Sequence, residues 1–199
     1  MPQQNPKPPL RVLLCDEDRG RAALLEQALA DAGYSVIARL SGAENLSAEV
    51  ARHQPDVIII DLDSPDRDTL EQMRTISREQ PRPIVMFAED DDSGTINQAI
   101  KAGVSAYVVD GLSGKRVRPV MEVAIARFRE YQALREELAR TKNSLEERKL
   151  IEQAKGLLMQ HRQMDENAAY QALRKLAMDQ GKKLPEVARN VIAIMELLG

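Results

Sequence analysis

The chain has 199 residues, which is enough for one domain of ordinary size and a second, smaller one. With 43% hydrophobic and 30% charged residues and no Trp, its composition argues against disorder and favours a helix-rich globular protein with an aliphatic core. A single cysteine, Cys15, excludes a disulfide framework and fits a reducing compartment. It lies in the apolar run VLLC, where a packed strand residue explains it better than a catalytic thiol.

The N-terminal sequence MPQQNPKPP lacks the apolar core of a signal peptide, and no segment approaches the roughly 18 apolar residues of a membrane span. We therefore expect a cytoplasmic protein that does not enter a membrane. Residues 1–130 carry 16 Lys or Arg against 21 Asp or Glu, whereas residues 131–199 carry 12 against 10. Of the two parts, only the second has a charge that suits contact with nucleic acid.

After a leader at residues 1–9, five apolar segments alternate with helical patterns. The expected strands are 11–15, 35–39, 57–60, 84–87 and 106–109. The first expected helix ends at Gly33, the next three lie near 43–53, 67–79 and 94–102, and a last one follows residue 109. Continuously apolar strands are typical of strands buried on both faces. The pattern predicts an α/β domain over residues 10–118, with a five-stranded parallel sheet between two layers of helices.

Neither Gly nor Pro occurs between Pro119 and Gly156, so the sequence predicts a helix far longer than average, with residues 119–152 as a linker. Apolar residues recur along it with the heptad spacing of a coiled coil, which predicts a parallel homodimer. The alternative is a single solvated helix, which Arg148 at the next seam position favours. The seam residues are Tyr131, Leu134, Leu138, Thr141 and Leu145.

Residues 153–199 are expected to form three short helices, of which the second covers 168–178 and the third 185–198. Asp165 can cap the second helix, and Pro185 suits the first turn of the third.

Acidic residues follow two of the predicted strands. Asp16 and Glu17 end the first strand and Asp61 ends the third, and the carboxyl ends of parallel strands meet at one edge of a sheet. Converging carboxylates repel one another unless a cation such as Mg²⁺ joins them, which predicts a site for Mg²⁺-assisted phosphorylation of an aspartate. The alternative is that these residues only solvate the loops.

Three segments together resemble a response-regulator receiver domain: VLLCDE at 12–17, VIIIDLDSP at 57–65 and AGVSAYVV at 102–109. The resemblance covers about residues 10–125 and implies a flavodoxin-like sheet. It also implies that Asp61 is the phosphoacceptor and that Asp16, Glu17 and Asp61 bind Mg²⁺.

Two positions depart from the receiver pattern. Ala88 stands where receivers have a Ser or Thr, and Asp110 stands where they have a Lys. A methyl group and a carboxylate cannot supply the hydrogen bond and the countercharge that a phosphoryl group needs, and Lys115 is the nearest alternative cation. We therefore expect control by a partner protein rather than by phosphorylation.

The tail closely resembles the ANTAR family, whose members are RNA-binding modules of antitermination regulators. The resemblance covers residues 135–199 and rests on ERKLIEQAKGLLM at 147–159, ENAAY at 166–170 and LRKLAM at 173–178. It implies a three-helix bundle that recognises paired hairpins in leader transcripts, with two tails of a dimer on two loops.

Basic residues of the tail can neutralise phosphates, and Tyr170 can stack on an unpaired base, although each basic residue could equally be a solvated charge and Tyr170 a core residue. Gly156 would allow close approach of an RNA backbone or of another helix. The expected RNA-binding residues are Lys149, Lys155, Gly156, Arg162, Tyr170, Arg174, Lys175 and Arg189.

The segment YVVDGL at 107–112 resembles the nitrate-assimilation branch of these regulators, the NasT type, in which a nitrate- or nitrite-sensing protein sequesters the regulator. The sequence disfavours two other functions. A phosphorylation-controlled DNA-binding regulator is disfavoured because the tail is only weakly basic and lacks a clear recognition helix. A phosphoester hydrolase is disfavoured because the chain has no Gly-rich phosphate loop and no capping domain.

Overall fold

The structure is a computed structural model, and it describes residues 8–109 and 114–198. The chain divides into two compact units, residues 1–132 and 133–199. The division falls inside the expected linker and within one helix, α5 (Gly114–Arg162), so the expected domain limits at residues 118 and 152 stay predictions. No helix in the described part is both long and apolar enough to span a membrane.

The first unit contains one sheet of five parallel strands in the order β2-β1-β3-β4-β5, the order found in flavodoxin-like folds. The predicted fold class, α/β followed by all-α, is confirmed, and each strand begins and ends within a residue of its expected bounds. The strands are β1 (Arg11–Asp16), β2 (Ser35–Leu40), β3 (Val57–Asp61), β4 (Ile84–Ala88) and β5 (Ala106–Val109).

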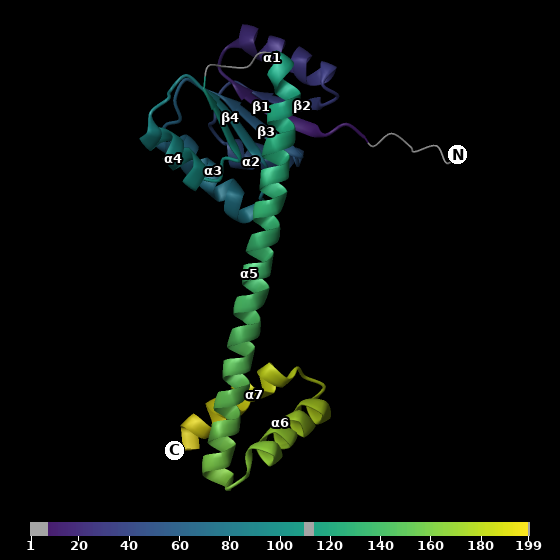
Figure 1. Cartoon of the computed structure of the whole chain (residues 1–199), viewed down its shortest axis with the longest axis vertical. Helices are drawn as coiled ribbons and strands as arrows, with labels where there is room; N and C mark the ends of the chain where they lie inside the picture. The colour runs from purple at the N-terminus through teal and green to yellow at the C-terminus, as the bar shows by residue number, and fades with distance from the viewer. Residues whose placement is uncertain (1–7, 110–113, 199) are drawn as a thin grey trace, which may run out of the picture. The chain divides into compact units, whose positions relative to one another are not determined.

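Helices cover both faces of this sheet (Figure 1). One face packs on α1 (Arg19–Asp31) and the first turns of α5, and the other packs on α2 (Leu46–His53), α3 (Arg67–Glu79) and α4 (Ser93–Lys101). Neighbouring residues of β1 enter different layers: Val12 and Leu14 contact the α1 side, whereas Leu13 and Cys15 contact the other. Because both faces are covered, the three central strands β1, β3 and β4 are buried and apolar at nearly every position.

Aspartates start three of these helices. The Asp18 side chain accepts hydrogen bonds from the backbone N–H groups of Gly20 and Arg21, and Asp66 and Asp92 cap α3 and α4 in the same way. Part of the acidic character at this edge of the sheet is therefore explained by helix capping, and the cap at Asp18 fixes the first turn of α1 beside the end of β1.

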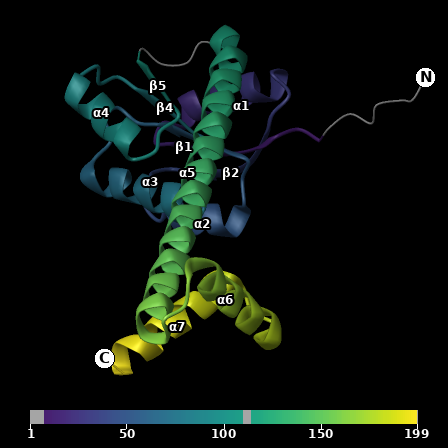
Figure 2. The same cartoon turned by 60° about the horizontal axis from the view of Figure 1, so that its bottom comes forward.

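The second unit consists of the C-terminal part of α5 with α6 (Glu166–Gln180) and α7 (Leu184–Leu198), as Figure 2 shows. Asp165 caps α6 by accepting a hydrogen bond from the N–H of Ala168 at 2.7 Å, and Pro185 lies in the first turn of α7, as predicted. The shared core is made of small and branched residues: Ala154, Leu158, Ala169, Leu173, Ala177, Val187, Ala188, Val191 and Ile192.

One feature of this unit differs from expectation. The first of the three helices is not separate, because α5 continues through Gly156 to Arg162. A glycine inside a helix costs only about 1 kcal/mol relative to alanine, and burial of Ala154 and Leu158 on either side of it offsets that cost.

Candidate functional site

The two expected acidic residues of the first unit lie side by side at the end of the sheet. Asp16 and Asp61 are the last residues of β1 and β3 and are paired in the parallel register. Both are buried, at 2% and 5% exposed. One oxygen of each carboxylate, Oδ2, has no hydrogen-bond partner in the described part of the chain. A buried carboxylate with an unsatisfied oxygen is costly, so this pair needs a cation nearby.

That cation is Arg21, which the sequence analysis did not identify. Its Nη2 lies 3.2 Å from Oδ1 of Asp16, its Nε 3.3 Å from Oδ2 of Asp61, and its Nη1 3.8 Å from Oδ1 of Asp63. Partial burial of Arg21 opposes its charge, but the hydrogen bond to Asp16 and the nearby carboxylates raise its pKa. The spacing held a signal, because an arginine in the first turn of a helix that follows an acidic strand end can reach back to it.

Burial is the largest cause of the pKa shifts of Asp61 and Cys15. It raises the pKa of Asp61 to about 6, helped by the carboxylates of Asp16, Asp63 and Glu89 and opposed by Arg21. Burial also raises the pKa of the Cys15 thiol to about 12, with further contributions from nearby carboxylates. Cys15 is thus a protonated, packed strand residue, which agrees with the structural alternative.

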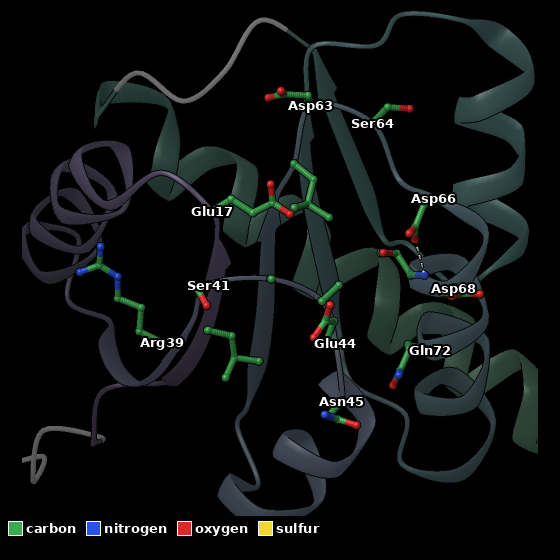
Figure 3. Close-up of a pocket in the computed structure, with 15 residues that line it drawn as sticks. Glu17, Arg39, Ser41, Glu44, Asn45, Asp63, Ser64, Asp66, Asp68 and Gln72 are labelled. Atoms are coloured by element: carbon green, nitrogen blue, oxygen red, sulfur yellow. Dashed lines mark hydrogen bonds between the residues drawn. The ribbon is translucent and has the colours of Figure 1, made fainter.

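An open polar cavity of about 980 Å³ lies on the α2 and α3 side of this end of the sheet (Figure 3), and its lining includes Glu17 and Leu62, which directly follow Asp16 and Asp61 in the sequence. Glu17, the third expected metal ligand, is exposed and lines this cavity together with Glu44, Asp63 and Asp68. Among the residues that the structure describes, Arg39 is the one basic residue in its lining. The charge of the cavity disfavours anions.

Receiver domains generally bind Mg²⁺ at this edge, and Asp16 and Asp61 have the oxygen donors that it requires. In the arrangement described here, however, the guanidinium of Arg21 lies against both carboxylates. Among residues 8–109 and 114–198, no three acidic, His or Cys side chains are grouped so that they could hold a metal ion. The pocket as arranged does not fit a bound Mg²⁺.

Ala88 and Asp110 are the two positions that depart from the receiver pattern. Ala88 is the buried last residue of β4 and is paired with Val109, so its methyl group leaves this strand end without a hydroxyl donor. Asp110 lies outside the described residues, as does the side chain of Lys115.

In the second unit, five of the six expected basic residues are exposed: Lys149, Arg162, Arg174, Lys175 and Arg189. Tyr170 is 38% exposed, and the helical spacing of four residues puts it on the same side of α6 as Arg174. Gly156 is exposed as well, and a Cβ atom added there would meet nothing within 4 Å. Packing within the chain therefore does not explain this glycine.

Lys155 has a different environment from the other basic residues. Its side chain is only 9% exposed, and its Nζ lies 2.9 Å from Oε1 of Glu152 and 2.7 Å from Oε1 of Glu166. Hydrogen bonds to Glu166 and Glu152 raise the pKa of Lys155. The structure thus uses its charge to join α5 to the start of α6, and we propose that Lys155, unlike the other five, does not contact phosphate.

The seam residues of α5 remain exposed in the single chain. Tyr131, Leu134, Leu138 and Leu145 are each between 53% and 59% exposed, so none packs fully on its own domain. The hydroxyl of Thr141 donates to the carbonyl of Glu137 in the same helix, at 2.9 Å. Thr141 can therefore be covered by a partner helix without losing a hydrogen bond.

Comparison with known proteins places the two units in known families. Residues 12–118 match the family model of the response regulator receiver domain, and residues 139–192 match that of the ANTAR domain. Among solved structures, the receiver domain of a modulated diguanylate cyclase from Desulfovibrio desulfuricans shares the fold, with a TM-score of 0.54 and 20% identity. That match covers 62% of this chain and 98% of the other.

Two curated relatives extend the comparison. The transcriptional regulatory protein PdtaR of Mycobacterium tuberculosis is 31% identical over 191 residues, which are 96% of this chain and 92% of that protein. The nitrate regulatory protein of Klebsiella oxytoca is 48% identical over 68 residues, which are 34% of this chain and 17% of that protein. The chain therefore belongs to the response regulators that join a receiver domain to an ANTAR domain.

Proposed function

We propose that this protein binds paired hairpins in leader transcripts through its ANTAR unit and thereby promotes transcription antitermination. The observation that carries the proposal is the ANTAR match over residues 139–192, in a unit that exposes five basic side chains and the ring of Tyr170. The basic side chains can neutralise phosphates, and an exposed ring can stack on an unpaired loop base. The open space around Gly156 would allow an RNA backbone to approach α5.

The test is a filter-binding titration of the full chain at one fixed salt concentration, with a two-hairpin leader RNA and duplex DNA of the same sequence. We expect a clear preference for the RNA. Arg174→Gln on α6 should weaken RNA binding, whereas Lys183→Gln, which removes the same charge from the turn before α7, should have little effect. A preference for the duplex would favour the alternative, a DNA-binding regulator whose control depends on phosphorylation.

We infer that the active form is a homodimer joined along α5. The support is the exposed row of Tyr131, Leu134, Leu138 and Leu145, since a parallel pair of helices would bury it. Two ANTAR units on one dimer would engage two hairpins at once, and the second contact then benefits from a high effective concentration. An RNA with one hairpin deleted should therefore bind about a hundredfold more weakly than the intact pair.

We infer further that the receiver unit is controlled by a partner protein rather than by phosphorylation. Ala88 supplies no hydroxyl for a phosphoryl group, and Arg21 already pairs with Asp61. The test is incubation with labelled acetyl phosphate and Mg²⁺, in which we expect no stoichiometric labelling of the full chain. Labelling that is lost in Asp61→Asn would contradict this part of the proposal.

The genes under control are proposed to be those of nitrate or nitrite assimilation, with a nitrate- or nitrite-sensing protein as the partner in the cytoplasm. The support is the similarity to the nitrate regulatory protein of Klebsiella oxytoca. Deleting the gene should abolish nitrate-induced expression of the assimilation genes. The intact protein should restore expression and the Arg174→Gln variant should not, whereas induction that survives the deletion would refute the assignment.

A further inference from the structure

The position of Arg21 follows from the cap of α1. The carboxylate of Asp18 accepts hydrogen bonds from the N–H groups of Gly20 and Arg21, at 2.7 and 2.8 Å, and so fixes the backbone of this turn. From there the guanidinium reaches back over the ends of β1 and β3. Its side chain is 37% exposed, whereas the carboxylate of Asp16 is fully buried and that of Asp61 is 7% exposed.

One guanidinium thus contacts the two carboxylates that stand in register on neighbouring strands. An Mg²⁺ ion between Asp16 and Asp61 would need their oxygens at about 2.0–2.1 Å in near-octahedral geometry. The guanidinium lies at hydrogen-bonding distance from the same carboxylates, and its positive charge would repel an incoming cation at close range in a partly buried site. Arg21 and the cation therefore compete for one position.

We propose that Arg21 is a built-in counter-cation that neutralises Asp16 and Asp61 and keeps the affinity of this pocket for divalent cations low. The inference concerns the receiver unit alone and does not depend on RNA binding by the tail. It predicts a specific response to removal of one side chain: without Arg21, two buried carboxylates face each other without the guanidinium, and a divalent cation can then neutralise them in competition with protons.

The experiment is a Mn²⁺ titration of the full chain, with free Mn²⁺ measured by electron paramagnetic resonance and Mg²⁺ added as a competitor. The variants are Arg21→Gln and the matched control Arg19→Gln, an exposed arginine at the start of the same helix. We expect weak, millimolar binding by the unaltered chain and by Arg19→Gln. We expect binding at least about tenfold tighter in Arg21→Gln, after allowing for solvent screening of a side chain that is partly exposed.

Adding Asp61→Asn to Arg21→Gln should cancel the gain, which would locate the tighter site at this pocket. Two results would overturn the proposal: micromolar binding of one Mn²⁺ by the unaltered chain, or equal affinities for Arg21→Gln and Arg19→Gln. Circular dichroism monitors folding of each variant. If Arg21→Gln does not fold, the titration of the unaltered chain still decides, because the proposal requires its binding to be weak.

Discussion

Replacing Lys155 with methionine should weaken the fold of the ANTAR unit without changing the number of RNA phosphates that it contacts. The Nζ atom of Lys155 lies within 3.0 Å of both carboxylate oxygens of Glu152 and 2.7 Å from Glu166. Two negative charges already surround this ammonium group, and the side chain is only 9% exposed. It therefore has neither the free charge nor the access needed to bind phosphate.

The magnitude follows from counterion release. Each phosphate contact contributes about 0.7 to 0.9 to the slope of log affinity against log salt concentration, so one contact is worth about threefold in affinity between roughly 50 and 200 mM salt. Arg174→Gln should lower the slope by about that amount per copy, whereas Lys155→Met should leave it unchanged. The melting temperature should show the reverse pattern, falling in Lys155→Met and staying constant in Arg174→Gln.

The assay measures RNA affinity at five or six salt concentrations for the unaltered chain and both variants, with thermal unfolding by circular dichroism beside it. A double variant, Lys155→Met with Glu166→Gln, should recover part of the lost stability because it removes the repulsion between Glu152 and Glu166. A Lys155→Met protein that melts normally but loses as much slope as Arg174→Gln would refute the reasoning, since Lys155 would then be a phosphate ligand.

Three further predictions follow from burial and charge. The double variant Leu134→Asp with Leu138→Asp should be a monomer in sedimentation velocity and should bind the two-hairpin RNA about a hundredfold more weakly. A variant that stays dimeric would refute the coiled-coil seam. Leu173 is 1% exposed, so Leu173→Ala should lower the unfolding free energy measured in urea by about 2–5 kcal/mol. Leu176 is 37% exposed, so Leu176→Ala should lower it by about 1 kcal/mol or less, and equal losses would mean that the core is wrongly placed. The folded pKa of Asp61, about 6, is raised above its ordinary 3.8, so its contribution to stability is present below about pH 4 and is lost as pH rises through 6. The unfolding free energy of Asp61→Asn should therefore exceed that of the unaltered chain by up to about 3 kcal/mol near pH 8, with a gap that closes toward pH 4. Urea unfolding across this pH range in the presence of a chelator measures that gap, and a gap independent of pH would contradict the assignment.

The sheet and the meeting of Asp16 with Asp61 could be predicted because they depend on backbone register and on simple patterns of hydrophobicity. A parallel sheet aligns the ends of its strands, so two acidic residues at strand ends must come close. The partners of these residues could not be predicted in the same way. The place of Arg21 in the first turn of α1 shows that it can reach the strand ends, but whether it turns toward them or toward solvent depends on side-chain conformation and on the charges around it.

The helical tail shows a second limit of sequence patterns. Ala169, Leu173 and Ala177 recur every four residues and form the buried side of α6, whereas Leu176, a larger apolar residue of the same helix, is 37% exposed. Two apolar rows overlap on this helix, and small alanines proved to lie on the buried one because they allow close approach of α5. The hydrophobicity of single residues therefore does not show which side of α6 faces inward.

The burial of Cys15 has a practical consequence for measuring how two copies pair. It is the single cysteine of the chain, its side chain is fully buried, and burial raises the pKa of its thiol to about 12. A cysteine introduced at Asn143, on the exposed middle of α5, would therefore react with maleimide dyes without competition from Cys15. Mixing donor-labelled and acceptor-labelled molecules would then report subunit exchange and the relative orientation of the two α5 helices through fluorescence energy transfer.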